Sequence, residues 1–497
     1  MLGAILAGFS QLLSINIMAL ILLGSFIGMV FGFIPGLNGT VALAIFIPFV
    51  FGMPINMSMA FLLGMHASVM FGGSISAILF NVPGTSQNIA TCFDGYPMSQ
   101  NGEAAKAIGI AGTSSLIGGL FGAVVLAIFL PLIRPFIIAF GPAELFMLII
   151  FGLSMIALLT ADTIVKGLIA GGLGLLVSFI GLDYITGAAR YTFGYLELWD
   201  GINFVPVAIG LFAIAQMIDL YIKGGSIAER TSNIDQSTVR EGIKYTFSKP
   251  GLLLRSSVLG TIIGMIPGVG GTVANILAYG HAMQTSKEPD KFSKGNPEGI
   301  VGPEAANNAK EGGALIPTLA FGIPGSQGMA ILLGAFIMIG IVPGPEMVTK
   351  HLDIVFMLVF IVVIGNIFAT GIGLISANKL QKLTVIPGKQ LVPIILAICL
   401  IGSFVTNGRF SDVIVALIFA ILGYFMKKYG YSRAAFIIAL VLGTLFERYY
   451  HITVRLYGSF FIFKRPISLI LLILVIISIT IPFVQSKKSK DIRQNIS

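Results

Sequence analysis

PGLNGTVA at residues 35–42 and PGVGGTVA at residues 267–274 are two copies of one short motif, identical at six of eight positions. A second pair follows: GGSISAILFNVPGTSQ at residues 72–87 and GGALIPTLAFGIPGSQ at residues 312–327. Similarity that recurs at a nearly constant spacing indicates an internal duplication. Both copies place Pro-Gly inside long apolar segments, which is typical of discontinuous membrane helices.

The composition outside these motifs is that of a membrane protein. Of the 497 residues, 56% are hydrophobic and 10% are charged, whereas soluble domains carry about 25% charged residues. A membrane span needs about 20 apolar residues. The sequence therefore predicts an all-α polytopic membrane protein with about 12 transmembrane helices. It also predicts two inverted repeats that contain broken helices or re-entrant hairpins.

The net charge of +9 does not indicate a nucleic-acid partner. The basic residues cluster in short loops between apolar stretches, which is typical of cytoplasmic loops near anionic lipid. The two cysteines, Cys92 and Cys399, form neither a metal motif nor a disulfide framework. The surface is thus predicted to meet a lipid membrane.

The chain is predicted to have four parts. These are a first membrane repeat at 1–222, a polar cytosolic linker at 223–251, a second membrane repeat at 252–484 and a basic C-terminal tail at 485–497. Three apolar segments are too short to span a bilayer and are predicted to be half-helices or hairpin arms, namely 40–53, 272–283 and 312–323.

Lysine content bears on how the repeats face the membrane. Residues 284–310 carry four lysines and are expected on the cytosolic side, together with the linker. Residues 85–106, taken as their counterpart in the first repeat, carry one lysine. This difference favours repeats of opposite orientation, with the two segments on opposite sides of the membrane.

The predicted helices are interrupted at four matched positions: Pro35-Gly36, Pro83-Gly84, Pro267-Gly268 and Pro324-Gly325. Proline removes a backbone hydrogen bond, so each break leaves free amides and carbonyls that lipid does not satisfy. Amides at the start of a half-helix attract anions, and carbonyls at its end attract cations. A single break is usually a mere kink, but four matched breaks favour a binding site.

Neutral polar residues lie beside the breaks and suit carboxylates and hard cations. For a small-molecule carboxylate substrate we single out Asn38, Thr40, Ser74, Asn81, Gly84, Thr85, Ser86, Gln87, Gly325, Ser326 and Gln327. For a coupling cation, with Na⁺ as the candidate, we single out Gly36, Gly268, Thr272, Asn275, Asn307 and Asn308. The alternative for each side chain is a hydrogen bond between packed helices.

Other polar residues give weaker signals. Asp94, followed by Gly-Tyr-Pro, favours a turn over a ligand. Glu304 lies on one predicted helical face with Asn307 and Asn308, and either meets a ligand or caps the helix. The four histidines are scattered and make no metal set. The motifs HExxH, GxxxxGKS/T and GxSxG do not occur, so we predict neither an enzyme nor a bound cofactor.

Three longer stretches carry a family resemblance: FGGSISAILFNVPGTSQNIATCFDGYPMSQNG at 71–102, EGIVGPEAANNAKEGGALIPTLAFGIPGS at 298–326 and GIVPGPEM at 340–347. They are similar to the large membrane subunit of tripartite tricarboxylate transporters, the TctA-type permeases. The resemblance implies uptake of di- or tricarboxylates across the bacterial cytoplasmic (inner) membrane, driven by a Na⁺ or H⁺ gradient. It also implies two partners, a small four-helix membrane subunit and an extracytoplasmic solute-binding protein.

Two other classes of function stay open at this point. A carboxylate or ion channel would use the same polar breaks without coupling, and saturable, gradient-dependent uptake distinguishes a transporter from it. An intramembrane enzyme would need a paired acid and base or a metal set within its spans, and the sequence indicates neither.

Overall fold

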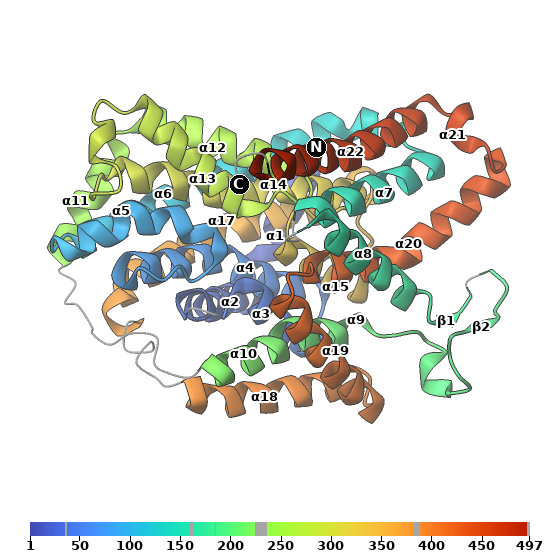
Figure 1. Cartoon of the computed structure of the whole chain (residues 1–497). Coiled ribbons are helices and arrows are strands. Elements are labelled where there is room, and N and C mark those ends of the chain that lie inside the picture. The colour runs from blue at the N-terminus through green and yellow to red at the C-terminus, as the bar shows by residue number, and fades with distance from the viewer. Residues whose placement is uncertain (35–36, 160–162, 184, 224–235, 381–387, 495–497) are drawn as a thin grey trace.

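The chain folds into a bundle of helices (Figure 1). The computed structural model describes residues 1–34, 37–159, 163–183, 185–223, 236–380 and 388–494. Within these ranges the strands are a single antiparallel pair, β1 (Gly181–Leu182) and β2 (Ala189–Arg190). The predicted all-α class is therefore confirmed. Pro35 and Gly36, which include one residue singled out for a cation, lie outside the described residues.

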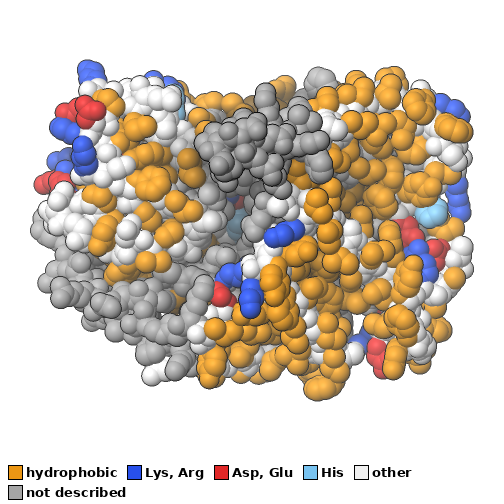
Figure 2. All heavy atoms as spheres, viewed as in Figure 1, with side chains coloured by type: hydrophobic (Ala, Val, Ile, Leu, Met, Phe, Trp, Pro, Cys, Tyr) orange, Lys and Arg blue, Asp and Glu red, His pale blue; other side chains and the backbone are white. Residues whose placement is uncertain are grey.

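Seven described spans are long and apolar enough to cross a membrane. They are α2 (Ile15–Phe33), α4 (Ile55–Phe80), α6 (Ala104–Ile138), the joined α9 (Phe204–Ala208) and α10 (Ala215–Lys223), α17 (Leu352–Leu380), α19 (Phe410–Lys428) and α20 (Arg433–Tyr457). A π-helical stretch, Ile209–Ile214, joins α9 to α10. Hydrophobic side chains cover broad areas of the described surface in Figure 2, as expected where lipid is the solvent.

The remaining helices are mostly shorter. They are α1 (Leu2–Ser10), α3 (Gly39–Phe46), α5 (Ile89–Gln100), α7 (Pro142–Leu159), α8 (Ile164–Ser178), α11 (Gln236–Phe247), α12 (Pro250–Met265), α13 (Gly270–Thr285), α14 (Glu298–Phe321), α15 (Gln327–Met338), α16 (Pro345–Thr349), α18 (Gly388–Val405), α21 (Phe461–Lys464) and α22 (Pro466–Gln494). Two short helices that meet at a break can cross together, so the number of about 12 crossings stays a prediction.

The described breaks lie between helices rather than inside them. α4 ends at Asn81 (φ 58°) and α14 ends at Gly322 (φ 70°), and both residues are left-handed caps. A 3₁₀ turn at Ser86–Asn88 (η3) leads from the first loop into α5, and α15 follows the second loop. In one respect the expectation was wrong: residues 312–321 are not a separate half-helix, because α14 continues unbroken from Glu298.

The two repeats have the same internal packing, and glycines make it possible. In the first repeat α2 lies along α4, and a Cβ on Gly28 or Gly32 would come within 2.1 Å of a backbone oxygen of Met65 or Val69. The absence of a side chain at these positions allows the two helix backbones to touch.

The second repeat reproduces these contacts residue by residue. α12 lies along α14, and a Cβ on Gly260 or Gly264 would come within 2.2 and 2.3 Å of the backbone oxygens of Ala306 and Lys310. The partner residues are offset by 241 in α4 and α14 (306 − 65 and 310 − 69) and by 232 in α2 and α12 (260 − 28 and 264 − 32). His66 in α4 therefore corresponds to Asn307 in α14.

Contacts between α4 and α14 show that these two equivalent helices run antiparallel. His66 bonds to Glu311, whereas Ser74, two turns further along α4, bonds to Glu304, earlier in α14. Each repeat also lends a helix to the other: α6 packs along α14, and α17 packs along α4. The repeats thus share one interior.

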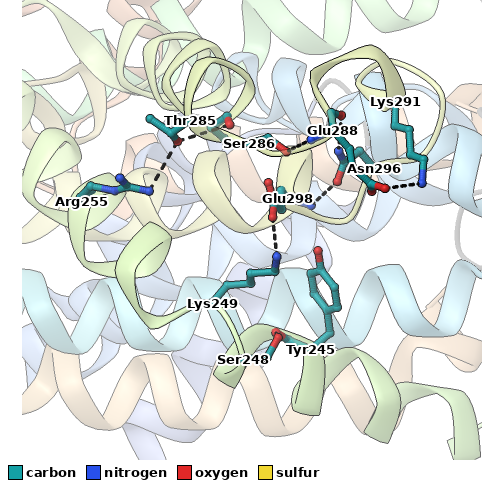
Figure 3. A network of polar contacts seen from close by, with 11 residues as sticks. Tyr245, Ser248, Lys249, Arg255, Thr285, Ser286, Glu288, Lys291, Asn296 and Glu298 are labelled. Carbon is teal, nitrogen blue, oxygen red and sulfur yellow. Dashed lines mark hydrogen bonds and ion pairs between the residues drawn. The ribbon is translucent and has the colours of Figure 1, made fainter.

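The two lysine-rich segments lie together, as expected. Figure 3 shows Lys249, at the junction of α11 and α12, beside Glu298 at the start of α14. The Lys249 Nζ lies 2.5 Å from Glu298 Oε1, and Arg255 Nη2 lies 3.5 Å from Thr285 Oγ1. Residues 236–249 and 286–297 are called the basic end below.

The predicted separation of 85–106 from 284–310 is wrong. Asp94 lies in α5 rather than in a turn, and its Oδ1 accepts the backbone N–H groups of Lys294, Gly295 and Asn296 at 3.2, 2.9 and 2.8 Å. Both segments therefore reach the basic end. The comparison of lysines failed because 284–310 comprises the loop before α14 and the first half of that helix, whereas 85–106 follows α4, so the two are not counterparts.

Candidate functional site

A cavity of about 390 Å³ lies where the breaks converge. Its described wall is built mainly from the first turns of four helices: Asn38, Gly39 and Thr40 at α3; Thr85, Ser86 and Gln87 at η3; Gly268 to Val273 at α13; and Ser326, Gln327 and Gly328 at α15. His66 and Met70 of α4, with Ala434 and Ile438 of α20, complete it. The volume is in the range of small-molecule sites.

Local capping explains why the helices begin at this cavity. Asn38 Oδ1 accepts the N–H of Val41 at 3.1 Å, and Ser326 Oγ accepts the N–H of Met329 at 3.3 Å. These are N-caps, which satisfy one amide of the first turn and leave the preceding ones free. At α13 no side chain caps the first turn. Gly268 and Gly270 have φ of +81° and +73°, which favour glycine.

Nine residues singled out from the sequence line this one cavity: Asn38, Thr40, Thr85, Ser86, Gln87, Gly268, Thr272, Ser326 and Gln327. Two more support its floor. A Cβ on Gly84 would come within 1.9 Å of the Gly32 oxygen, and a Cβ on Gly325 within 3.0 Å of the Gly264 oxygen. The residues expected for substrate and for cation thus share one wall, and their separate roles stay predictions.

The other five described candidates lie outside this wall. Ser74 Oγ donates to Glu304, and Asn81 is the exposed cap of α4. Asn275 Oδ1 accepts the N–H of Ala90, which joins α13 to α5. Asn308 Nδ2 donates to Asn366 of α17 at 2.8 Å. Asn307 is fully buried, and its amide atoms have no partner among the described residues.

A buried charged group behind the cavity was missed by the sequence reasoning. His66 Nε2 lies 3.0 Å from Glu311 Oε2, and Glu311 pairs with the neighbouring Lys310. Lys310 is fully buried, and its Nζ donates to Gln87 Oε1 at 2.8 Å. Lys310 was expected on the cytosolic side, but it lies inside α14. One pattern in the sequence could have revealed this group: Lys310 and Glu311 directly precede Gly312-Gly313 of the duplicated motif.

Glu304 forms a second buried centre, which holds four helices together. Its carboxylate accepts hydrogen bonds from Ser74 of α4 and Ser115 of α6, both at 2.8 Å, and from Thr91 of α5. Of the two readings open from the sequence, neither a helix cap nor a cavity-lining ligand fits, because Glu304 lies inside α14 and away from the cavity wall.

The cavity wall carries little formal charge. Among its described residues His66 is the single ionisable side chain. Helix N-termini carry partial positive charge, so four of them around one cavity favour an anion. Hydroxyl and amide side chains can then orient its oxygens. In the described residues no group of three or more His, Cys, Asp or Glu side chains is arranged to hold a metal ion.

Comparisons with known proteins point to a transporter family. Residues 18–438 match the family described as the tripartite tricarboxylate transporter TctA family. The chain is 32% identical over 437 residues to a protein of Agrobacterium vitis named "Uncharacterized 52.8 kDa protein in TAR-I ttuC' 3'region", covering 86% of this chain and 84% of that one. A second A. vitis protein, "Uncharacterized protein in TAR-II ttuC' 3'region", is 34% identical over 190 residues, or 38% of this chain and 78% of its own length. No solved structure matches.

Proposed function

The chain belongs to the tripartite tricarboxylate transporter TctA family, and we propose that its central cavity binds a di- or tricarboxylate during secondary-active uptake. It is a tricarboxylate transporter subunit and a multi-pass membrane protein. The convergence of four helix N-termini on one cavity carries the proposal, because free amides there can replace the water that a carboxylate loses.

The two repeats contribute matched halves of this site. Substrate carboxylates would rest on the first turns of α3 and η3 from one repeat and of α13 and α15 from the other. Thr40, Ser86 and Gln327 would accept or donate hydrogen bonds without a buried charge of their own. A substrate with carboxylates at two ends would thus be held by both repeats at once.

An inverted arrangement of the repeats would give this site its alternating access. The antiparallel contacts of α4 and α14 support it, since the same motif reaches the cavity from opposite directions. A movement of one repeat against the other then opens the site to one side at a time. A site that changes access only when fully loaded or empty couples substrate to ion flux.

The family supports a proposal about the assembly and its location. Proteins of this family work within tripartite transporters, so partner subunits are implied. We propose a small four-helix membrane subunit and an extracytoplasmic solute-binding protein as those partners, and the bacterial inner membrane as the location. The lysines and arginines at the basic end would place that end in the cytoplasm.

Protection of an introduced thiol by citrate tests the site. We expect citrate to slow the reaction of a maleimide with Ser86→Cys in the purified full chain, since Ser86 lines the cavity. Ser248→Cys, exposed at the basic end, is the matched control and should react at the same rate with or without citrate. If citrate, malate and tartrate all fail to slow the reaction at position 86, the result counts against the proposal.

Uptake by cells that carry the chain and its partner subunits tests the mechanism. We expect saturable accumulation of labelled citrate that collapses when the ion gradients are removed. Flux that neither saturates nor accumulates would instead indicate a channel.

A further inference from the structure

His66 occupies a special position in the cavity wall. It is 3% exposed, and among the described wall residues it is the single ionisable one. Its Nε2 faces Glu311, whereas Nδ1 has no partner among the described residues. Its Cε1 edge faces the first turn of α15, where a Cβ on Gly328 would come within 2.4 Å of Cε1. One nitrogen is thus engaged, while the other is buried and keeps an unpaired hydrogen-bonding position among the described residues.

Lys310 and Glu311 set the charge around this imidazole. They form an ion pair whose charges cancel, so the group is neutral when His66 is neutral. Lys310 reaches the wall through Gln87, which accepts its Nζ at 2.8 Å. Protonation of His66 would leave one net positive charge at the edge of the cavity, which a carboxylate would stabilise.

The charged groups on every helix packed against α4 are accounted for. Glu311 and Lys310 of α14 face His66, while α2, α3 and α15 contain no Asp, Glu, Lys or Arg. Asp353 and Lys379 of α17 and Lys106 and Arg134 of α6 lie near helix ends. On α5, Asp94 bonds to residues 294–296. Glu304 and Glu298 of α14 bond to three hydroxyls and to Lys249 respectively.

We infer that His66 takes up one proton when a carboxylate enters the cavity, so that the proton is the coupling ion of this transporter. The inference rests on the proposed function and assigns its coupling step. The proton comes from water on the entry side and adds to the lone pair of Nδ1, while Nε2–H continues to donate to Glu311. It returns to water when the carboxylate leaves, so no bond other than N–H is made or broken.

The cavity itself enforces the coupling. While the cavity is empty, a protonated His66 would face neutral wall residues alone among those described, and a bound anion supplies its counter-charge. The anion in turn gains a cationic partner, so proton and carboxylate bind together or not at all. Glu311 and Glu304 offer no open carboxylate for sodium. Glu311 is paired with Lys310 and His66, and Glu304 accepts hydrogen bonds from three hydroxyls. The equivalent position in the second repeat is Asn307, which cannot ionise, so one proton accompanies each substrate.

Calorimetry of citrate binding tests the inference on the full chain in detergent or nanodiscs. Titrations at about pH 7.5 in buffers of different ionisation enthalpy give the number of protons taken up per citrate bound. We expect up to about one for the wild type, and an affinity that weakens by up to about tenfold per pH unit as the pH is raised. For His66→Asn we expect no proton uptake by the protein and an affinity that is flat over the same range.

The choice of variant and controls keeps the outcomes separate. Asparagine is what the second repeat holds at the equivalent place and is therefore the first choice, and His66→Gln serves if His66→Asn does not fold. His351→Asn, at an exposed loop position, should match the wild type. Proton uptake that persists in His66→Asn would overturn the inference.

Citrate binding by the wild type in sodium and in choline salts tests the same inference without a variant. We expect citrate to bind equally with sodium or with choline as the salt cation, and a strict need for sodium without proton uptake would overturn the inference. These results leave the proposed function standing, because citrate still binds. Failure of citrate, malate and tartrate to bind at all would instead remove the proposed function.

Discussion

At the scale of single residues, close approach of backbones decides which side chains fit at Gly84 and Gly325, in the loops after α4 and α14. A Cβ on Gly84 would come within 1.9 Å of the Gly32 oxygen and 2.5 Å of the Gly73 Cα. At Gly325 the nearest atoms are the Ala314 Cβ at 2.9 Å and the Gly264 oxygen at 3.0 Å. Rigid backbone cannot move aside cheaply, so the first site is the stricter one.

Alanine substitutions test this difference. We expect Gly84→Ala to destabilise the protein by about 1–3 kcal/mol and to reduce uptake strongly, and Gly325→Ala to do less of both. Thermal unfolding in detergent and uptake by cells measure the two effects. Gly171→Ala in α8 is the control, because nothing lies within 4 Å of its Cβ. An equal loss in all three variants would contradict this account.

The sequence pointed to many of the neutral residues that line the cavity but not to the charged group behind it. Asn38, Ser86 and Gln327 could be found because they follow Pro-Gly breaks, and breaks in membrane helices need polar partners. His66 lies in the middle of an apolar helix with no neighbouring motif. Only the packing of α4 on α14 brings it to Glu311, across 245 residues of chain. A pairing at such separation leaves no local pattern to read.

At the scale of secondary-structure elements, charge misled the assignment of α14. Hydropathy predicts its second half as a separate short apolar segment, because Glu304, Lys310 and Glu311 precede it. A hydropathy profile assigns charged residues such as these to a loop. In the fold, however, each has a partner on another element: Glu304 bonds to Ser74, Lys310 to Gln87 and Glu311 to His66. Helices without internal charges are easier to place: hydropathy predicts spans at 15–34 and 57–80, and α2 and α4 occupy Ile15–Phe33 and Ile55–Phe80.

The start of α14 allows a prediction about pH. Burial of the Glu298 carboxyl group raises its pKa, but hydrogen bonds from Lys249 and Ser286 outweigh this, and the net pKa lies below its usual value. The folded pKa is thus lower than the unfolded one of about 4.3. The contact therefore contributes its full stability above that value and loses it as the pH falls through the folded pKa.

Comparison of two variants isolates this contribution. We expect Glu298→Gln to lower the midpoint of thermal unfolding at about pH 7 but to differ less from the wild type below about pH 4. The effect should not exceed about 1 kcal/mol, because Lys249 is 35% exposed and water screens the pair. Glu288→Gln removes the more exposed pair with Lys291 and should change little at either pH. A Glu298→Gln effect that stays constant with pH would refute the assignment.

At the scale of the whole molecule, the two ends of the bundle differ in what they gather. The basic end collects residues 236–249, the loop before α14 and the end of α5. At the other end, Ile55 at the start of α4 lines a cavity with Gly340 and Val342, which follow α15. Equivalent helices of the two repeats therefore leave the central cavity toward different ends, which is what an inverted duplication requires.

Labelling of single cysteines in intact cells tests this arrangement and its orientation together. Met53→Cys and Val342→Cys should react with a membrane-impermeant maleimide added outside, because they are exposed at the end away from the basic residues. Asn101→Cys and Lys287→Cys should react only after the cells are opened, because the basic end faces the cytoplasm. Cys92 and Cys399 are buried and should give a low background. If position 53 labels with 101 rather than with 342, the repeats are not inverted; if the pairs hold but the sides are exchanged, the orientation alone is wrong.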